Sequence, residues 1–527
     1  MVENRSLART RTAKGFAALR EGRLKEAEEA ARAALGEDPT RPEAHFLVGL
    51  LAIERKDWRT GIAAFGSVTK LNPADRAAWA QLALLFQRIG RFDRADDALA
   101  RALEEAPSNP ETTDLIGAVL TQFGRHREAA TWHRKAVEAD PHRADFAINF
   151  ASACIFLGRD GEAAAVLDRF IEAEGVPQAE WLYSTLRRAG GRARADRLAA
   201  RAGAAQTASG RAFLAYAAGK EYEDCELWDD AYSAFELGAR AKRSVIAFDE
   251  GAEISLFDAM GAQFTAAWFE GAKRGFEDAA PIFIVGQPRT GTTLVERIIA
   301  SHSSVESAGE LQQFALAIRR AGGFSRDADS VGAWSRADPR AIGEAYIRSV
   351  APMRGGKPRF VDKMPRNFLY VPLIAAALPR AKIIHLTRDP LDACFASFKQ
   401  LFAEAYPHSY DQEEMARHYC RYARLMGHWR TVAPGAFLDV SYEKLVADVE
   451  NEARRMIDFL DMPWEDQCLR FHELETPVAT ASAVQVREAA HGRSVGRALK
   501  YREKLAPMRR VLASEGLLSP VVEGLER

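Results

Sequence analysis

A glycine-rich turn at residues 286–293 has the composition of an anion-binding site. The segment GQPRTGTT follows the apolar run PIFIVG and precedes the helical pattern LVERIIA. Glycines allow a tight turn in which backbone N–H groups converge at the N-terminus of the next helix, where the helix dipole favours an anion. Arg289 and the hydroxyls of Thr292 and Thr293 would add donors at the same place. The segment therefore predicts a phosphate cradle.

The cradle differs from ATP-binding loops at one position. Its spacing nearly matches the Walker A pattern G-x-x-x-x-G-K-[ST], but Thr292 stands where that pattern has the lysine that reaches the β- and γ-phosphates. Glycine and threonine also serve ordinary turns between a strand and a helix. A nucleoside triphosphate with magnesium therefore fits this loop poorly. Because the rest of the spacing agrees with the Walker A pattern, a P-loop nucleotide kinase stays an alternative.

Polar side chains follow the other β-rich runs of the same region. After about residue 270, the runs RFVD, KIIHLT and AFLDV alternate with helical segments. This alternation is typical of a parallel sheet with crossover helices, in which ligands bind at the carboxyl ends of the strands. Lys363, Arg388 and Tyr442 come within two residues of the ends of these runs, and Glu310 lies in the loop after the cradle helix. We expect them to gather beside the cradle.

Each of these four residues also has a purely structural alternative. Arg388 could cap a helix or pair with the aspartate that follows it, and Lys363 could pair with the aspartate that precedes it. Glu310 could be a first-turn carboxylate that the helix dipole stabilises. Tyr442 could simply belong to the core.

The first third of the chain repeats with a period of 34 residues. On this period fall Pro39, Pro73, Pro107 and Pro141, and the series Gly22, Lys56, Gly90, Gly124 and Gly158; five residues after that series come Ala27, Gly61, Ala95, Ala129 and Ala163. Such a period predicts two antiparallel helices per unit, which the glycine position separates and the small residue lets approach closely. The segment from about residue 7 to 175 resembles the tetratricopeptide repeat.

Three regions are therefore predicted. Residues 1–175 form an all-α superhelix of tetratricopeptide repeats, 176–269 form degenerate helical repeats and a linker, and 270–527 form an α/β, P-loop-like domain with a parallel sheet. Within the middle region, residues 213–243 predict one further helical hairpin. The concave face of a repeat superhelix suggests docking of a peptide or protein segment, or self-association. A scaffold for the neighbouring domain is the alternative.

Four segments in sequence order resemble one enzyme family. They cover nearly all of 281–510 and are PIFIVGQPRTGTTLVERIIASHSSVESAGEL, FVDKMPRNFLYVPLIAAALPRAKIIHLTRDPLDACFASFKQLF, FLDVSYEKLVADVE and TASAVQVREAAHGRSVGRALKY. They resemble sulfotransferases that use 3′-phosphoadenosine-5′-phosphosulfate (PAPS), in particular the bacterial tetratricopeptide-repeat sulfotransferases related to tyrosylprotein sulfotransferase. The resemblance implies the sulfotransferase fold, PAPS as the sulfuryl donor and a hydroxyl-bearing acceptor.

The resemblance also implies which residues hold the donor. The 5′-phosphosulfate would be bound by the cradle residues Arg289, Thr290, Gly291, Thr292 and Thr293. Arg388 would pair with the 3′-phosphate. The family's second donor to that phosphate is a serine that corresponds to Ala396, and whether the adjacent Ser397 replaces it stays open. The remaining assignments are Tyr442 near the nucleotide, and Ser482, Ser494 and Arg497 in a C-terminal segment that closes over the site.

The catalytic groups follow from the same resemblance. In the tyrosylprotein relatives, the glutamate that matches Glu310 takes the proton of the acceptor hydroxyl. Lys363, with help from Arg289, would stabilise the charge that develops on the leaving oxygen. His302 and His385 fall in a predicted helix and strand, so we expect structural roles for both. Cations and N–H groups can neutralise the donor, and no metal is expected.

Composition limits the partners. The chain has 72 Lys and Arg against 73 Asp and Glu, so it has no general basic field for nucleic acid. Its apolar stretches are far shorter than the roughly 18–20 residues that cross a bilayer, and its polar N-terminus lacks a signal-peptide core, so we expect a cytoplasmic protein without a membrane partner. Five scattered cysteines disfavour disulfides and zinc.

Three questions stay open at this point. The acceptor could be a protein tyrosine, a carbohydrate or a small molecule, and the repeats could bind a partner or a second copy. A non-catalytic scaffold with a degenerate nucleotide domain is the last alternative.

Overall fold

The computed structural model describes residues 2–105, 109–172, 175–323, 328–402, 405–480 and 483–518. The chain divides into two compact units, residues 1–153 and 154–527. The predicted boundaries at 175 and 269 both lie inside the second unit. Within the described residues, no helix combines the length and the apolar character needed to cross a membrane.

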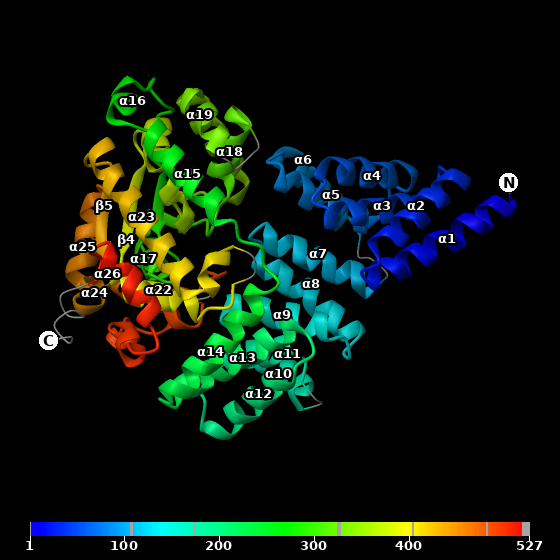
Figure 1. Ribbon diagram of the computed structural model, residues 1–527. Coiled ribbons are helices and arrows are strands. Elements are labelled where there is room, and N and C mark those ends of the chain that lie inside the picture. The colour runs from blue at the N-terminus through cyan, green and yellow to red at the C-terminus, as the bar shows by residue number, and fades with distance from the viewer. Residues whose placement is uncertain are drawn as a thin grey trace. The chain divides into compact units, whose positions relative to one another are not determined.

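The first unit consists of helical hairpins (Figure 1). Its helices are α1 (Val2–Arg20), α2 (Leu24–Glu37), α3 (Pro42–Glu54), α4 (Trp58–Leu71), α5 (Arg76–Arg88), α6 (Phe92–Leu103), α7 (Pro110–Gln122), α8 (His126–Ala139) and most of α9 (Ala144–Leu157). The predicted turn positions Gly22, Lys56, Gly90, Gly124 and Gly158 all have φ between 59° and 74°. A left-handed turn is therefore built at each, and only Lys56 adopts it with a side chain.

The predicted small positions lie where the helices of a hairpin meet. Ala27, Ala95, Ala129 and Ala163 are fully buried. At Gly61 of α4, an added Cβ would come 3.7 Å from the Ala52 side chain of α3, the other helix of its hairpin. These positions confirm the predicted hairpin geometry, while Pro107 lies outside the described residues.

More helices open the second unit. They are α10 (Asp160–Glu172), α11 (Pro177–Leu186), α12 (Arg192–Ala204), α13 (Ala208–Asp224), α14 (Trp228–Arg243), α15 (Glu250–Gln263) and α16 (Ala266–Gly271). The predicted hairpin of residues 213–243 is confirmed as α13 and α14. This hairpin packs on the α/β part of the unit, because the Tyr216 hydroxyl donates a hydrogen bond of 2.9 Å to the Phe398 carbonyl.

The α/β part contains one parallel sheet of five strands. The strands are β1 (Pro281–Gly286), β2 (Val305–Ser307), β3 (Arg359–Asp362), β4 (Lys382–Thr387) and β5 (Phe437–Ser441), in the spatial order β2-β3-β1-β4-β5. The sequence predicted four of them. It missed β2, which has only three residues and carries the polar pair Glu306 and Ser307.

Helices cover both faces of this sheet. They are α17 (Thr292–Ala300), α18 (Gln313–Gly322), α19 (Ala328–Arg336), α20 (Pro339–Val350), α21 (Val371–Ala377), α22 (Pro390–Phe398), α23 (Gln412–Val432), α24 (Tyr442–Ala447), α25 (Val449–Phe459) and α26 (Ala506–Ser514).

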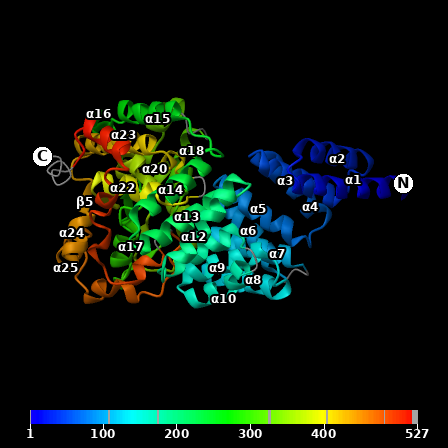
Figure 2. The same cartoon turned by 60° about the horizontal axis from the view of Figure 1, so that its bottom comes forward.

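Alternate residues of β1 pack into two separate cores. Ile282 and Ile284 join a core with α17 and α25, whereas Phe283 and Val285 join a core with α18, α20 and α23. Figure 2 shows α24 and α25 beside β5, which they contact. The strand order reverses around β1, since β3 lies on one side of it and β4 on the other. Such a reversal is where α/β sheets bind ligands, at the carboxyl ends of the strands.

Candidate active site

The predicted cradle joins β1 to α17 in a strained turn. Gly291 has a φ of 103°, and an added Cβ there would lie 2.6 Å from the Tyr442 ring. Arg289 has a φ of 65°, which is uncommon for a residue with a side chain. The Thr290 hydroxyl donates a hydrogen bond of 2.8 Å to the Gln287 carbonyl, so it braces the turn from within. The loop is therefore pre-shaped rather than a generic connection.

The end of the cradle is the first turn of α17. Thr292 and Thr293 open this helix and are buried. The N–H groups of a first helical turn have no acceptor within their own helix and carry the positive end of the dipole. The Thr293 hydroxyl lies 3.3 Å from that of Thr480, in the C-terminal part of the chain. An anion would meet N–H groups and hydroxyls together here.

Two arginines meet at the cradle. Arg388 follows β4, is buried, and donates hydrogen bonds of 2.8 Å to the Arg289 carbonyl and 2.5 Å to the Ser494 carbonyl. Its guanidinium also lies 4.7 Å from the centre of the Tyr442 ring and 3.7 Å from a carboxylate oxygen of Asp392. Among the described residues, Arg388 Nε is buried and has no hydrogen-bond partner. One donor is thus left for a ligand.

The positive charge of Arg388 affects the pKa of Arg289. Burial, followed by the charge of Arg388, lowers the pKa of Arg289 to about 10. Its guanidinium donates a hydrogen bond of 3.1 Å to the Gln485 side chain. Two cations held close together in a partly dehydrated site favour a polyanionic ligand, because an anion relieves their repulsion.

Glu310 and Lys363 form an ion pair on the other side of the cradle. Glu310 follows β2, Lys363 follows β3, and the Lys363 ammonium contacts Glu310 Oε1. The Lys363 N–H donates a hydrogen bond of 2.9 Å to the Gly309 carbonyl, which ties the two loops together. The alternative in which Lys363 pairs with the preceding aspartate is wrong. Asp362 instead accepts a hydrogen bond of 2.9 Å from the Tyr346 hydroxyl, and burial raises its pKa to about 8.

Of the other predicted site residues, Ser397, Tyr442 and Ser494 lie at the cradle or at Arg388, whereas Arg497 lies over Trp228. Ser397 is buried and donates a hydrogen bond of 3.3 Å to the Pro288 carbonyl, so its hydroxyl faces the cradle backbone. Tyr442 lies under Arg388, as described above. Ser494 accepts the Arg388 hydrogen bond with its backbone carbonyl, and the Arg497 guanidinium lies 5.3 Å from the centre of the Trp228 ring. Ser482 lies outside the described residues.

The alternative partner proposed for Arg388 is also wrong. The aspartate that follows it, Asp389, caps α22 by accepting a hydrogen bond of 3.0 Å from the Asp392 N–H. Asp392 is the carboxylate nearest the Arg388 guanidinium, and it also accepts hydrogen bonds from the N–H groups of Gly496 and Ala498. One buried aspartate thus links Arg388 to the C-terminal segment.

The two histidines singled out in the sequence have structural partners. His385 contacts Asp439 at 2.6 Å and the Tyr422 hydroxyl at 2.5 Å, and burial lowers its pKa. His302 lies just after α17 rather than inside it, and its Nε2 is 2.9 Å from the Pro463 carbonyl. Neither ring is aimed at the cradle.

A hydrogen-bonded chain that the sequence did not predict reaches the cradle from α15. Glu253 contacts His418 Nδ1 at 2.9 Å, and His418 Nε2 lies 3.3 Å from the side chain of the cradle residue Gln287. Although burial opposes it, hydrogen bonds from His418 and Arg421 lower the pKa of Glu253 to about 2. His408 stacks on His418 with ring centres 3.6 Å apart and nearly parallel planes. A single ion cannot lie in both ring planes, so we interpret this cluster as a brace for the cradle.

A second unpredicted contact comes from the helical hairpin. Glu223 of α13 contacts the Lys399 ammonium at 2.7 Å and accepts a hydrogen bond of 2.9 Å from the Tyr501 hydroxyl. Although burial opposes it, Lys399 lowers the pKa of Glu223. The charge of Glu223 also acts on Arg289. Glu223 lies 66 residues before Arg289, and no local pattern in the sequence marks it.

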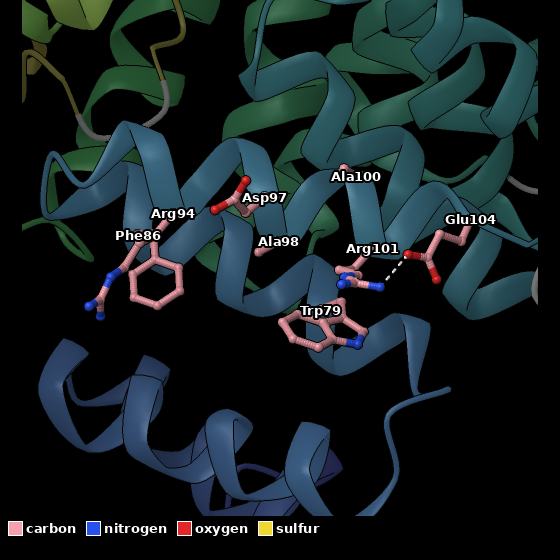
Figure 3. A pocket seen from close by; sticks show the side chains of 8 residues that line it. All are labelled: Trp79, Phe86, Arg94, Asp97, Ala98, Ala100, Arg101 and Glu104. Atoms are coloured by element: carbon pink, nitrogen blue, oxygen red, sulfur yellow. Dashed lines mark hydrogen bonds and ion pairs between the residues drawn. The ribbon is translucent and has the colours of Figure 1, made fainter.

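The repeats of the first unit carry a groove of their own (Figure 3). Trp79 and Phe86 of α5 and the side chains of α6, among them Arg94 and Arg101, line it. Arg94 lies over the Phe86 ring, and Arg101 pairs with Glu104 at 2.8 Å. The groove thus combines aromatic surface with charges of both signs.

Comparison with known families bears on both parts of the chain. Residues 281–466 match the family model of the sulfotransferase family, and residues 12–65, 46–110 and 81–144 match that of the tetratricopeptide repeat. The chain carries a sulfotransferase-family domain. This domain begins at the first residue of β1 and contains the cradle, Glu310, Lys363, Arg388 and Tyr442. It follows tetratricopeptide repeats, as the sequence predicted.

Individual relatives cover parts of the chain. An uncharacterized protein of Aquifex aeolicus is 33% identical over 253 residues, which are 45% of this chain and 33% of that protein. A "putative protein-tyrosine sulfotransferase" of Caenorhabditis briggsae is 29% identical over 195 residues, which are 37% of this chain and 69% of that protein. This chain therefore spans only a third of the Aquifex protein's length.

Proposed function

We propose that the protein transfers a sulfuryl group from PAPS to a hydroxyl group of an acceptor. One arrangement carries the proposal. The cradle follows the central strand β1, Arg388 follows β4 on one side, and the Lys363–Glu310 pair follows β2 and β3 on the other. Cations and a carboxylate thus flank a phosphate-sized turn at one edge of the sheet. The sulfotransferase-family match of the same residues supports the assignment.

The donor would be held by groups already in place. The first-turn N–H groups of α17, the hydroxyls of Thr292 and Thr293, and Arg289 would bind the 5′-phosphosulfate. Arg388 would bind the 3′-phosphate, since its Nε is buried with no partner among the described residues. Ser397 would support the cradle backbone through Pro288 rather than replace the usual serine outright.

The reaction would exchange one bond at sulfur. The bond between sulfur and the bridging oxygen of the 5′-phosphate breaks, and a bond between sulfur and the acceptor oxygen forms. Glu310 would take the acceptor proton, and Lys363 would stabilise the negative charge that the departing phosphate oxygen gains. Arg289 and the N–H groups of the cradle would supply the remaining charge compensation, and we propose that no metal takes part.

The acceptor would be presented on the repeats. The groove of α5 and α6 offers aromatic surface and both charge signs, which suits a peptide or protein segment. The name of the nematode relative makes a protein tyrosine the first acceptor to test.

A binding comparison followed by a transfer assay tests the proposal. The purified chain is titrated with 3′-phosphoadenosine-5′-phosphate, with AMP and with ATP plus magnesium, and its melting temperature is followed. A ligand at a hundred times its dissociation constant stabilises the native state by about 2.7 kcal/mol. Selective stabilisation by the 3′-phosphorylated nucleotide without metal is expected. A response only to ATP with magnesium would favour a kinase, and no response at all would favour a scaffold.

Transfer itself is followed with isotopically labelled PAPS and tyrosine-containing peptides. The variant Glu310→Gln should lose about 100-fold or more of the turnover, because general-base catalysis contributes on that order. Its affinity for 3′-phosphoadenosine-5′-phosphate should stay near that of the wild type. Wild-type turnover in Glu310→Gln would remove Glu310 from the mechanism.

A further inference from the structure

The Lys363 ammonium lies between two carboxylates rather than beside one. It contacts Glu310, and it also lies 3.9 Å from Glu296 Oε2. Lys363 is only 1% exposed, whereas the Glu310 side chain is 40% exposed and that of Glu296 is 9% exposed. The two partners therefore differ: Glu310 can meet a ligand from the solvent side, and Glu296 is enclosed.

Glu296 is held in place by the short strand that the sequence did not predict. The Ser307 hydroxyl of β2 donates a hydrogen bond to Glu296 Oε1. The same hydroxyl accepts a hydrogen bond of 3.1 Å from the Gly309 N–H, next to Glu310. One serine thus fixes the position of both carboxylates around the lysine.

We propose that Glu296 is a positioning residue that keeps the buried Lys363 paired while Glu310 leaves it to act as the base. This inference rests on the proposed function. An ammonium in contact with a carboxylate lowers the basicity of that carboxylate. Glu310 is therefore a stronger base for the acceptor proton once Lys363 has moved away from it. A lysine this deeply buried cannot be left without a partner, because an unpaired buried charge is costly.

Glu296 meets that requirement because it stays beside Lys363 on the enclosed side. As the lysine turns toward the departing oxygen of the donor, Glu296 balances its charge and Glu310 is released to the acceptor hydroxyl. The charged groups that face Glu296 are Lys363, Glu310 and Arg297 of its own helix. Arg297 is committed elsewhere, since it donates hydrogen bonds to the carbonyls of Phe471 and Thr476. Burial raises the pKa of Glu296, and Lys363 opposes that shift.

Thermal unfolding tests the sharing of Lys363 without any need for activity. We expect Glu296→Gln and Glu310→Gln each to lower the melting temperature by about 2 °C or less, because either one leaves the lysine a partner. The double variant should lose clearly more than the sum of the two, because the buried ammonium then has no carboxylate. Adding Lys363→Met to the double variant should recover most of the lost melting temperature. Additive losses, or no recovery with Lys363→Met, would overturn the inference.

A variant of this series that fails to fold also tests the inference. A double variant that fails to fold while both single variants and the triple variant fold would support a shared lysine. A Glu296→Gln single variant that fails to fold, and that Lys363→Met does not rescue, would show a packing role and overturn it.

Kinetics test the release of Glu310 once the wild type is shown to transfer. In Glu296→Gln we expect kcat to fall on the order of tenfold, because the lysine stays on Glu310, while the affinity for 3′-phosphoadenosine-5′-phosphate changes less than about threefold. The acidic limb of the profile of kcat against pH should move to lower pH, because loss of a neighbouring negative charge disfavours protonation of the base. Ser307→Ala should show the same changes at smaller size.

Glu306→Gln is the matched control. Glu306 precedes Ser307 in β2, so its side chain points to the other face of the strand, where it accepts a hydrogen bond of 2.6 Å from the Gly355 N–H. It should leave kcat and the pH profile unchanged. An unchanged kcat and profile in Glu296→Gln would overturn the positioning role. A wild type without sulfuryl transfer would refute the proposed function, and the unfolding series would still decide how Lys363 is held.

Discussion

Replacement of Arg388 by lysine separates recognition of a 3′-phosphate from general attraction of anions. Lysine keeps the positive charge but loses the planar fork and its Nε donor. In the structure, two arms of that fork hold the carbonyls of Arg289 and Ser494, and Nε is buried without a partner among the described residues. The variant therefore removes the donor that we propose for the 3′-phosphate, and it loosens two anchors of the site.

The expected magnitude follows from the number of bonds lost. A hydrogen bond to a charged group contributes about 1.5–3 kcal/mol, so losing one Nε–phosphate bond should weaken binding of 3′-phosphoadenosine-5′-phosphate about 10- to 150-fold. Loosening of the cradle would also weaken the binding of AMP, and it would weaken the binding of AMP and of 3′-phosphoadenosine-5′-phosphate by the same factor. The ratio of the two dissociation constants therefore isolates the contact with the 3′-phosphate.

Isothermal titration calorimetry measures both constants on the wild type and on Arg388→Lys. Arg359→Lys is the matched control, because Arg359 also donates to a backbone carbonyl, that of Leu460, but lies at the amino end of β3. It should leave the ratio unchanged. If Arg388→Lys weakens both nucleotides by the same factor, Arg388 does not bind the 3′-phosphate and the donor assignment is refuted.

Three further variants test other parts of the site. Asp362→Asn should flatten the pH dependence of stability. Burial raises the pKa of Asp362 to about 8, so the wild type loses stability as pH rises up to and through that value. The melting temperature of the variant, measured relative to that of the wild type, should therefore rise between pH 5 and 8.5. A constant difference would contradict this. Gly291→Ala should cost more than about 1–2 kcal/mol in urea unfolding, since φ is 103° and the new Cβ would meet Tyr442. Arg487→Ala removes a hydrogen bond of 2.8 Å to the Phe156 carbonyl and should speed proteolysis around residues 483–490; an unchanged cleavage rate would show that this anchor is dispensable.

Much of the site could be predicted from local sequence because its residues follow strands. The cradle, Lys363, Arg388 and Tyr442 each come at the carboxyl end of an apolar run, and parallel pairing brings those ends to one edge. The repeats were equally predictable, because a 34-residue period repeats the same hairpin and the same left-handed turn position.

Other features depend on contacts between residues far apart in the chain. Glu223 approaches Lys399 across 176 positions, and the Val478 N–H donates a hydrogen bond of 2.8 Å to the Phe156 carbonyl. Neither contact has a period or a motif, because a single hydrogen bond or ion pair leaves no pattern in the neighbouring residues. Local patterns therefore could not reveal them.

The sequence by itself determined the types of group that gather at the cradle and the order of the elements that carry them. Only the tertiary structure decided which carboxylate each cation meets. Lys363 pairs with Glu310 and lies beside Glu296, not with its neighbour in the chain, and Arg388 lies beside Asp392 rather than the aspartate next to it. The reason is physical: burial makes an unpaired charge costly, so each buried cation takes the carboxylate that packing places beside it, whatever its position in the sequence.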